Sequence, residues 1–323
     1  MIIKILKIAF LYVGTIIGAG FATGKELTAY FNGVNIFTMI FAGIVLGLFA
    51  GYYLYLGKIF KEDLSVVAFG KYSKVFDILV FVSVFFVFVS MFDTSDIIIF
   101  DMFNIKYGGY FTILATLLVA IIGISFIKKV NALVIPAIVI MIIVIFAKQP
   151  TATIVGKTTV FSPILYAGMN IMLAGYIIKP EGKHLTNNEI TLITIVTSIV
   201  FSIIMSMLYE IVKCSDDIMP LFSIAKLYNL HIVAGMIIYF AIITTALSTE
   251  CVLIDYINLY IKNKYIIGLV LFLSAIPFKI YVGFEDIVDF IYPIVSILGL
   301  LVTIFSFIRI IMQKKIKKQN KKV

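Results

Sequence analysis

Long apolar segments follow one another along almost the whole sequence of 323 residues. A stretch of about 18 or more apolar residues is long enough to cross the hydrocarbon core of a bilayer as a helix. The composition agrees, because 62% of the residues are hydrophobic and 13% are charged, whereas a soluble domain is about half apolar and about a quarter charged. We therefore expect an all-α, polytopic membrane protein with a single transmembrane domain over residues 1–323.

The apolar pattern predicts about ten transmembrane helices, two short interfacial helices at 60–70 and 218–228, and a basic tail at 312–323. The expected spans are 5–31, 35–57, 74–101, 109–127, 130–147, 160–178, 188–212, 231–259, 265–281 and 287–311.

Basic residues predict the orientation of these spans. Of the 26 Lys and Arg residues, 19 fall on one side, six fall on the other, and Lys25 is set aside because it lies inside the first span. Cytoplasmic loops carry the excess of basic residues, so both termini are expected in the cytoplasm. The lysines of the tail are expected to contact anionic lipids rather than nucleic acid.

Residues 14–26 (GTIIGAGFATGKE) interrupt the first span with four glycines and a charged pair, Lys25 and Glu26. An unpaired backbone amide or carbonyl is costly in hydrocarbon, so a broken helix is tolerated only where it is buried in protein or lines a watery cavity. Broken helices of this kind form the midplane binding sites of many secondary transporters. The sequence therefore predicts non-helical backbone at about 18–24.

The sixth span shows a weaker interruption, with Pro163 near its start and Gly168 and Asn170 near mid-membrane. It runs opposite to the first span, which predicts a five-plus-five inverted repeat, with one repeat at about 5–147 and the other at about 160–311. Non-helical backbone is expected at 167–170, so helices 1 and 6 would both be broken. For the sixth span, close helix packing through small residues is an open alternative.

The sequence at this point resembles the YkvI-like family of bacterial membrane proteins. The resemblance rests on residues 14–26 and, more weakly, on 165–171 (LYAGMNI), 244–246 (TTA) and 292–293 (YP). That family is placed in the amino acid–polyamine–organocation superfamily, which has the leucine-transporter fold. The resemblance implies a protein of the bacterial cytoplasmic membrane that takes up or exchanges amino acids or similar small solutes by ion coupling.

The resemblance also implies a sodium site between the first span and the eighth. By analogy its ligands are the carbonyls of Gly14, Ile17 and Ala241 and the hydroxyls of Thr244 and Thr245. Oxygen ligands suit a hard cation, so Na⁺ is a possible coupling ion. The alternative is that both threonines hydrogen-bond to carbonyls of their own helix.

The expected substrate site surrounds the half-helix that begins near Gly20, because its free amides favour a carboxylate. Its residues are Gly18, Ala19, Gly20 and Phe21 of the first span and Tyr166, Gly168 and Asn170 of the sixth. A small zwitterion such as an amino acid would suit such a site.

Acidic residues inside the spans are further candidates. Asp93 and Asp96 are spaced i, i+3 on one helix face, and such carboxylates normally face a cavity or a partner. They could bind a substrate ammonium, carry a proton, pair with Lys25, or lie at the outer interface near Asp101. Glu26, Asp93 and Asp96 are therefore the candidates for proton coupling.

Other acids are expected to play lesser roles. Glu250 and Asp255 are expected to line the cytoplasmic vestibule, and Glu210, Asp216 and Asp217 to be solvated charges of an outer loop.

The sequence points to transport rather than catalysis. It has two histidines (His184 and His231) and two cysteines (Cys214 and Cys251) without the spacing of a metal site or disulfide framework. No motif of an enzyme is recognised, so no cofactor is expected apart from a coupling ion. The predicted function is symport of an amino acid or similar zwitterion with sodium or a proton. The alternative is an amino-acid-sensing membrane subunit of a receptor complex, which binds without transporting.

Overall fold

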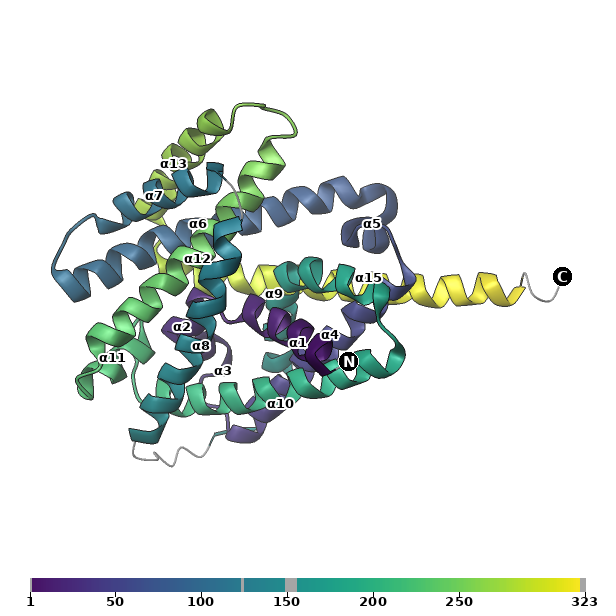
Figure 1. Ribbon diagram of the computed structural model, residues 1–323, viewed down its shortest axis with the longest axis horizontal. Helices are drawn as coiled ribbons and strands as arrows, with labels where there is room; N and C mark the ends of the chain where they lie inside the picture. The colour runs from purple at the N-terminus through teal and green to yellow at the C-terminus, as the bar shows by residue number, and fades with distance from the viewer. Residues whose placement is uncertain (1, 123–124, 149–155, 320–323) are drawn as a thin grey trace.

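The computed structural model describes residues 2–122, 125–148 and 156–319, and in this part the chain is helical apart from turns and an isolated β-bridge between Val34 and Lys157 (Figure 1). The helices are α1 (Ile2–Ile16), α2 (Ala19–Thr23), α3 (Lys25–Phe31), α4 (Ile36–Ile59), α5 (Leu64–Phe69), α6 (Ser73–Phe103), α7 (Gly108–Ile122), α8 (Ser125–Lys148), α9 (Phe161–Ile178), α10 (Asn187–Val212), α11 (Pro220–Leu227), α12 (His231–Ile257), α13 (Lys264–Tyr281), α14 (Phe284–Asp286) and α15 (Tyr292–Gln319). Shorter turns are η1 (Gly70–Tyr72), η2 (Lys179–His184) and the π-helical η3 (Ile287–Ile291).

Six helical segments of the described chain are long and apolar enough to cross a membrane, and a bent pair would make seven. The six are Ile36–Ile59, Leu64–Phe103, Asn187–Val212, His231–Ile257, Lys264–Tyr281 and Phe284–Gln313. Two further apolar helices, Gly108–Ile121 and Leu133–Lys148, are shorter. The chain is thus a polytopic helical membrane protein, while the count of ten spans and the inverted repeat stay predictions. Residues 320–323 of the expected basic tail lie outside the described residues.

The helices pack in two groups. In the first, α4 packs against α9 and α10, and α1 packs against the same two helices. In the second, α6, α7 and α12 pack against one another, and α13 packs against α6 and α7. The segments α2 and α3 lie between the groups, because α2 contacts α12 while α3 contacts α9 and α10.

The pairing of α4 with α10 depends on glycines spaced four residues apart. A Cβ at Gly43 would lie 2.5 Å from the Cα of Ser202, and one at Gly47 would lie 2.7 Å from the backbone N of Ser198. Gly51 continues the same face of α4. Small residues at this spacing let two backbones approach closely, which strengthens helix packing where hydrophobic burial gives little.

The first predicted span is interrupted, as the sequence indicated. Helix α1 ends at Ile16, the backbone is irregular at Ile17–Gly18, and one helical turn, α2, follows before a second interruption at Gly24. Gly24 has φ +84°, a left-handed conformation that favours glycine. The prediction of a break at 18–24 is confirmed at both ends, but the middle of that range is helical.

The predicted break at 167–170 is wrong, because α9 is helical from Phe161 to Ile178. The chain bends by 60° only further on, between Phe161–Met172 and Ala174–His184. Gly168 has a different purpose: a Cβ there would lie 2.5 Å from the carbonyl oxygen of Ser296. The glycine therefore allows α9 to pack closely on α15, which is the alternative that the sequence left open.

Candidate functional site at the break of the first span

The first interruption of the span, at Ile17–Gly18, contacts α12. The amide of Ala19 donates a hydrogen bond of 3.1 Å to Thr245 Oγ1, and a Cβ at Gly18 would lie 3.2 Å from the same oxygen. The carbonyls of Gly14 and Ile17 accept no hydrogen bond from the described residues. Two backbone carbonyls at the first interruption therefore have no hydrogen-bond donor among the residues that the structure describes.

The neighbouring threonine is arranged differently. Thr244 donates a hydrogen bond of 3.0 Å to the carbonyl of Ala241, within its own helix. For Thr244 the structure therefore has the intrahelical bond that was the alternative to a sodium ligand. Thr245 faces the break. The sodium site itself stays a prediction.

Glu26 lies over Gly20 and forms the polar centre of the site. A Cβ at Gly20 would lie 2.5 Å from Glu26 Cδ, so only glycine leaves room for this carboxylate. The hydroxyl of Tyr166, on α9, donates a 3.3 Å hydrogen bond to Glu26 Oε2. Glu26 and Tyr166 are both buried. A carboxylate of the protein itself thus lies where the sequence predicted that of a substrate.

Aromatic rings enclose this pair. The rings of Tyr30 and Phe31, from α3, each meet the ring of Tyr166 edge-on at a centroid distance of 5.4 Å. The hydroxyls of Tyr30 and Ser296 lie 2.7 Å apart, which connects the enclosure to α15. Phe21, on α2, is also fully buried. The centre of the site is therefore a dry enclosure made by α2, α3 and α9.

The other predicted residues of the sixth span, Asn170 and Gly168, contact their own helix or α15 rather than Glu26. The side-chain amide of Asn170 donates a 3.0 Å hydrogen bond to the carbonyl of Tyr166, within α9. Gly168 packs against α15, as described above. Both residues therefore stabilise the helix and its packing in this conformation, and their role toward a substrate stays a prediction.

Asp93 and Asp96 meet a lysine that the sequence analysis did not single out. Lys279, near the end of α13, forms an ion pair with Asp96 and lies 4.0 Å from Asp93 Oδ1. The amide of Gly109 donates to Asp96 Oδ1 at 2.5 Å, and the amide of Phe284 donates to Asp93 Oδ2 at 2.8 Å. We call Asp93, Asp96 and Lys279 the Lys279 cluster. It connects α6 with α7, α13 and α14.

Lys25 has another partner than these aspartates. Its Nζ lies 2.5 Å from Glu285 Oε1, in an ion pair between α3 and α14. A lysine within an apolar segment requires an acidic partner. Lys279 follows the apolar run of α13, so the sequence did indicate that this lysine has an acidic partner. Its distance in the chain from the aspartates hid the pairing.

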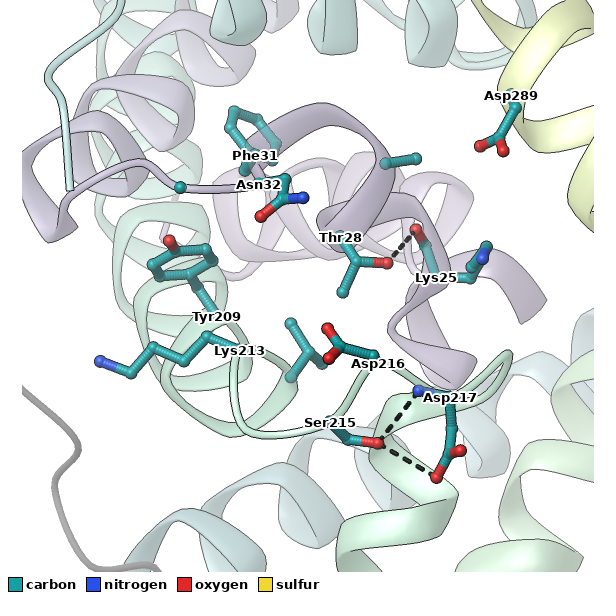
Figure 2. Close-up of a pocket in the computed structure, with 13 residues that line it drawn as sticks. Lys25, Thr28, Phe31, Asn32, Tyr209, Lys213, Ser215, Asp216, Asp217 and Asp289 are labelled. Carbon is teal, nitrogen blue, oxygen red and sulfur yellow. Dashed lines mark hydrogen bonds between the residues drawn. The ribbon is translucent and has the colours of Figure 1, made fainter. Parts of the chain in front are cut away.

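A pocket of about 400 Å³ opens beside α3 (Figure 2). Figure 2 shows Thr28 of α3 and Asn32, which follows this helix, facing the end of α10 and the loop after it, with Asp289 of η3 at one edge. Asp216 and Asp217, expected as solvated loop charges, line this pocket. Sequence reasoning missed the pocket because three segments far apart in the chain, within 25–33, 209–217 and at Asp289, form its wall.

Glu250 differs from its expected position in a cytoplasmic vestibule. Its side chain is fully buried, and Thr116 Oγ1, on α7, donates a 2.6 Å hydrogen bond to Glu250 Oε1. Asp255, five residues further along α12, is exposed. The two acids therefore lie in different environments.

Comparisons with known proteins agree with this architecture. No family model matches the sequence. The uncharacterized membrane protein YkvI of Bacillus subtilis (strain 168) is 23% identical over 336 residues, which cover 91% of this chain and 92% of that protein. A manganese transporter of Eremococcus coleocola is similar in structure, with a TM-score of 0.57 and 14% identity for a mutant form. The same transporter in complex with an aromatic bis-isothiourea substituted compound gives 0.58 and 13%. Both alignments cover 94% of this chain and 77% of the transporter, so this helical membrane protein has the fold of a membrane transporter.

Proposed function

We propose that this protein is a secondary active transporter of a small zwitterion, such as an amino acid, coupled to Na⁺ or a proton across the bacterial cytoplasmic membrane. The observation that carries the proposal is the break of the first span. It is held on one side by the Ala19–Thr245 hydrogen bond and on the other by the Glu26–Tyr166 hydrogen bond. Irregular backbone at membrane depth supplies polar groups that a substrate or ion can satisfy.

The proposed substrate site combines Glu26 with the amides at the start of α2. The ammonium group of an amino acid would pair with Glu26 in place of the Tyr166 hydroxyl. The substrate carboxylate would receive hydrogen bonds from amides at the start of α2, where the helix end favours negative charge, once Glu26 turns from Gly20 toward the ammonium group. The rings of Phe21, Tyr30 and Phe31 would exclude water from the substrate side chain. Gly18, Ala19, Gly168 and Asn170 complete the proposed wall.

The proposed coupling-ion site lies one turn away from the substrate site. Its candidate ligands are the unpaired carbonyls of Gly14 and Ile17 with the Thr245 hydroxyl. Thr244 and the carbonyl of Ala241 would join them if their mutual hydrogen bond opens. A hard cation prefers such oxygen ligands to nitrogen or sulfur.

Manganese is the alternative cargo that the structural neighbours suggest. Among the residues described by the structure, no group of three or more His, Cys, Asp and Glu side chains could hold a metal ion. Carboxylate and carbonyl oxygens suit Mn²⁺ as well as Na⁺, and the break offers a single carboxylate, Glu26, beside its carbonyls and hydroxyls. A zwitterion is the proposed substrate because Glu26 and the helix amides match its two opposite charges, and manganese is the alternative that the uptake experiment tests.

Uptake in proteoliposomes tests the proposal. Purified protein is reconstituted and offered a panel of radiolabelled amino acids under a sodium gradient, a proton gradient, or neither, and Mn²⁺ is offered in parallel. We expect at least one amino acid to accumulate in a gradient-dependent manner and Mn²⁺ to be excluded. Saturable binding of an amino acid without uptake under any gradient would instead identify a sensing subunit, and uptake of Mn²⁺ alone would refute the assigned substrate class.

A further inference from the structure

Glu250 is a buried acid that the proposed substrate and ion sites do not use. Its side chain has no exposed surface, and its Oε1 accepts the 2.6 Å hydrogen bond from Thr116. The second oxygen, Oε2, has no hydrogen-bond partner within the described part of the chain. A buried polar atom left without a partner is rare in native structures and requires an explanation.

No positive charge neutralises this carboxyl group in the described structure, since none of the ion pairs includes Glu250. Helix α7, which supplies Thr116, has no charged residue over Gly108–Ile122. Of the other helices against α12, α6 carries Lys74, Asp77, Asp93, Asp96 and Asp101, α8 carries Lys148, α11 carries Lys226 and α13 carries Lys264 and Lys279, and no ion pair joins any of these described side chains to Glu250. On α8, Lys128 and Lys129 have side chains outside the described residues.

The environment of Glu250 therefore favours its neutral form. Burying an ionised carboxylate without a partner is so unfavourable that such a group takes up a proton instead. A neutral carboxylic acid needs only hydrogen bonds, and the Thr116 hydroxyl, which also lies 3.0 Å from the carbonyl of Ile113 in its own helix, forms one of them. The protonated oxygen is then a donor that becomes free to lose its proton only if water reaches it.

Glu250 is also mechanically connected to the break of the first span. Thr245, which accepts the hydrogen bond from Ala19, lies five residues before Glu250 on α12, about 7.5 Å along the helix axis. A movement of α2 relative to Thr245 therefore acts on the helix that carries Glu250. If α12 shifts away from α7, the carboxyl group loses Thr116 and gains access to cytoplasmic water.

We propose that Glu250 is a proton-binding site of the transport cycle. The neutral acid is closed between α7 and α12. When these helices separate, the carboxyl O–H bond breaks, the proton passes to cytoplasmic water as hydronium, and the carboxylate remains until it is reprotonated. This inference rests on the proposed function, and it adds a coupling residue outside Glu26, Asp93 and Asp96.

Infrared difference spectroscopy tests the proton directly and needs no substrate. Protein in lipid nanodiscs is taken from acid to alkaline pH, and the carbonyl stretch of neutral carboxylic acids is recorded. Wild type should show an acid carbonyl band at acid pH that disappears at alkaline pH. Asp255→Asn, which changes the exposed acid of the same helix, is the control and should behave like wild type. Glu250→Gln should lack this band at every pH. The amide of Gln can still accept the hydrogen bond from Thr116, so this variant should fold. Identical difference spectra for wild type and Glu250→Gln would overturn the proposal.

A second variant tests the proposal if Glu250→Gln does not fold. Thr116→Val keeps the acid and removes its hydrogen-bond donor, so the band assigned to Glu250 should move to the frequency of a carbonyl without a hydrogen bond. A band that stays in place would show that it belongs to another acid, and would also overturn the proposal.

Transport measurements separate this inference from the proposed function. In proteoliposomes with a mixture of radiolabelled standard amino acids as probe, Glu250→Gln should lose accumulation driven by a proton gradient at least tenfold. It should keep exchange at equal pH, and Asp255→Asn should behave as wild type. Accumulation by Glu250→Gln at the wild-type level would refute the role of Glu250 and leave the transporter intact. If wild type transports no probe, the proposed function fails, and the infrared result alone decides whether Glu250 exchanges a proton.

Discussion

At the residue scale, the site depends on one glycine and one carboxylate. The sequence indicated Gly20 and Glu26 because a glycine weakens a helix and a charged side chain is costly inside a bilayer. It could not predict that the Glu26 side chain turns back over Gly20, since that requires the second interruption at Gly24. The hydrogen bond from Tyr166 joins residues 140 positions apart, which no local pattern encodes.

Replacing Gly20 by alanine should displace Glu26 and break its hydrogen bond with Tyr166. The added Cβ would lie 2.5 Å from Glu26 Cδ, so the carboxylate must move. We expect substrate binding to weaken at least about tenfold, equivalent to about 1.4 kcal/mol. Binding to purified protein measures this, and Gly283→Ala is the matched control because its Cβ would meet nothing closer than 3.7 Å. Equal affinities for the two variants would contradict the assigned site.

The adjacent threonines of α12 provide a second comparison. Thr245→Val removes the acceptor of the Ala19 amide, and an unsatisfied buried donor costs about 1–3 kcal/mol. Thr244→Val removes only a bond within α12, so we expect a clearly lower melting temperature for the Thr245 variant in detergent. We also expect the response of substrate binding to sodium to decrease more in that variant. A larger effect at Thr244 would place the ion ligands on the other face of the helix.

The charge of the substrate is testable with ligands instead of variants. Because the site offers helix amides as well as a carboxylate, an amino acid should bind at least about tenfold more tightly than its amide, a difference of about 1.4 kcal/mol. Competition binding with purified protein measures the ratio. Equal displacement by the two ligands would show that the helix amides do not bind the substrate carboxylate.

At the scale of elements, the Lys279 cluster connects the end of α13 with α6, and the Lys25–Glu285 pair connects the adjacent α14 with α3. They differ in exposure: the side chains of Lys279 and Asp96 are 13% and 16% exposed, while Glu285 is 50% exposed. Lys279 also lies 5.1 Å from the ring centroid of Tyr110 and 5.5 Å from that of Phe92. The two ion pairs should therefore differ in energy.

Lys279→Met should destabilise the protein more than Lys25→Met. Removal of Lys279 leaves two mostly enclosed carboxylates facing each other, and breaking a buried pair costs about 3–5 kcal/mol. The pair with the half-exposed Glu285 is worth about 1 kcal/mol or less. Thermal unfolding in detergent measures both variants. If Asp93→Asn and Asp96→Asn introduced with Lys279→Met fail to restore stability, repulsion between the aspartates is not the cause.

The elements themselves were largely predictable, because helix positions follow from local apolar pattern and capping. The interfacial helices expected at 60–70 and 218–228 correspond to α5 and α11. The break at 167–170 was not predictable, since glycine and asparagine have the same local signature whether they end a helix or allow it to pack. Only the contact of Gly168 with Ser296 on α15 distinguishes these cases.

At the scale of the whole molecule, the chain forms two helix groups with the broken span between them (Figure 1). Sequence alone indicated a membrane protein, but it could not show which helices belong together, because grouping depends on contacts between distant segments. Orientation, in contrast, was inferred from the distribution of basic residues and remains a prediction.

Labelling of the two cysteines tests that orientation. Cys214 is exposed in the loop after α10, on the expected outer side, whereas Cys251 is buried in α12. A membrane-impermeant maleimide should therefore label intact cells that carry wild type or Cys251→Ser, and should not label cells that carry Cys214→Ser. Labelling that requires permeabilised cells would invert the topology and place both termini outside.

The close contact of α4 with α10 limits how such a molecule can move. The glycines of α4 lie directly against the backbone of α10. Neither helix can therefore slide along the other without a steric clash. We therefore expect α4 and α10 to move together as one rigid body. The two groups are connected where α8 packs on both α10 and α12, and by polar contacts of the broken span, such as Ala19 with Thr245 and Lys25 with Glu285. Close packing thus fixes one helix pair, whereas a hydrogen bond and an ion pair, which can break and re-form, connect the broken span to its neighbours.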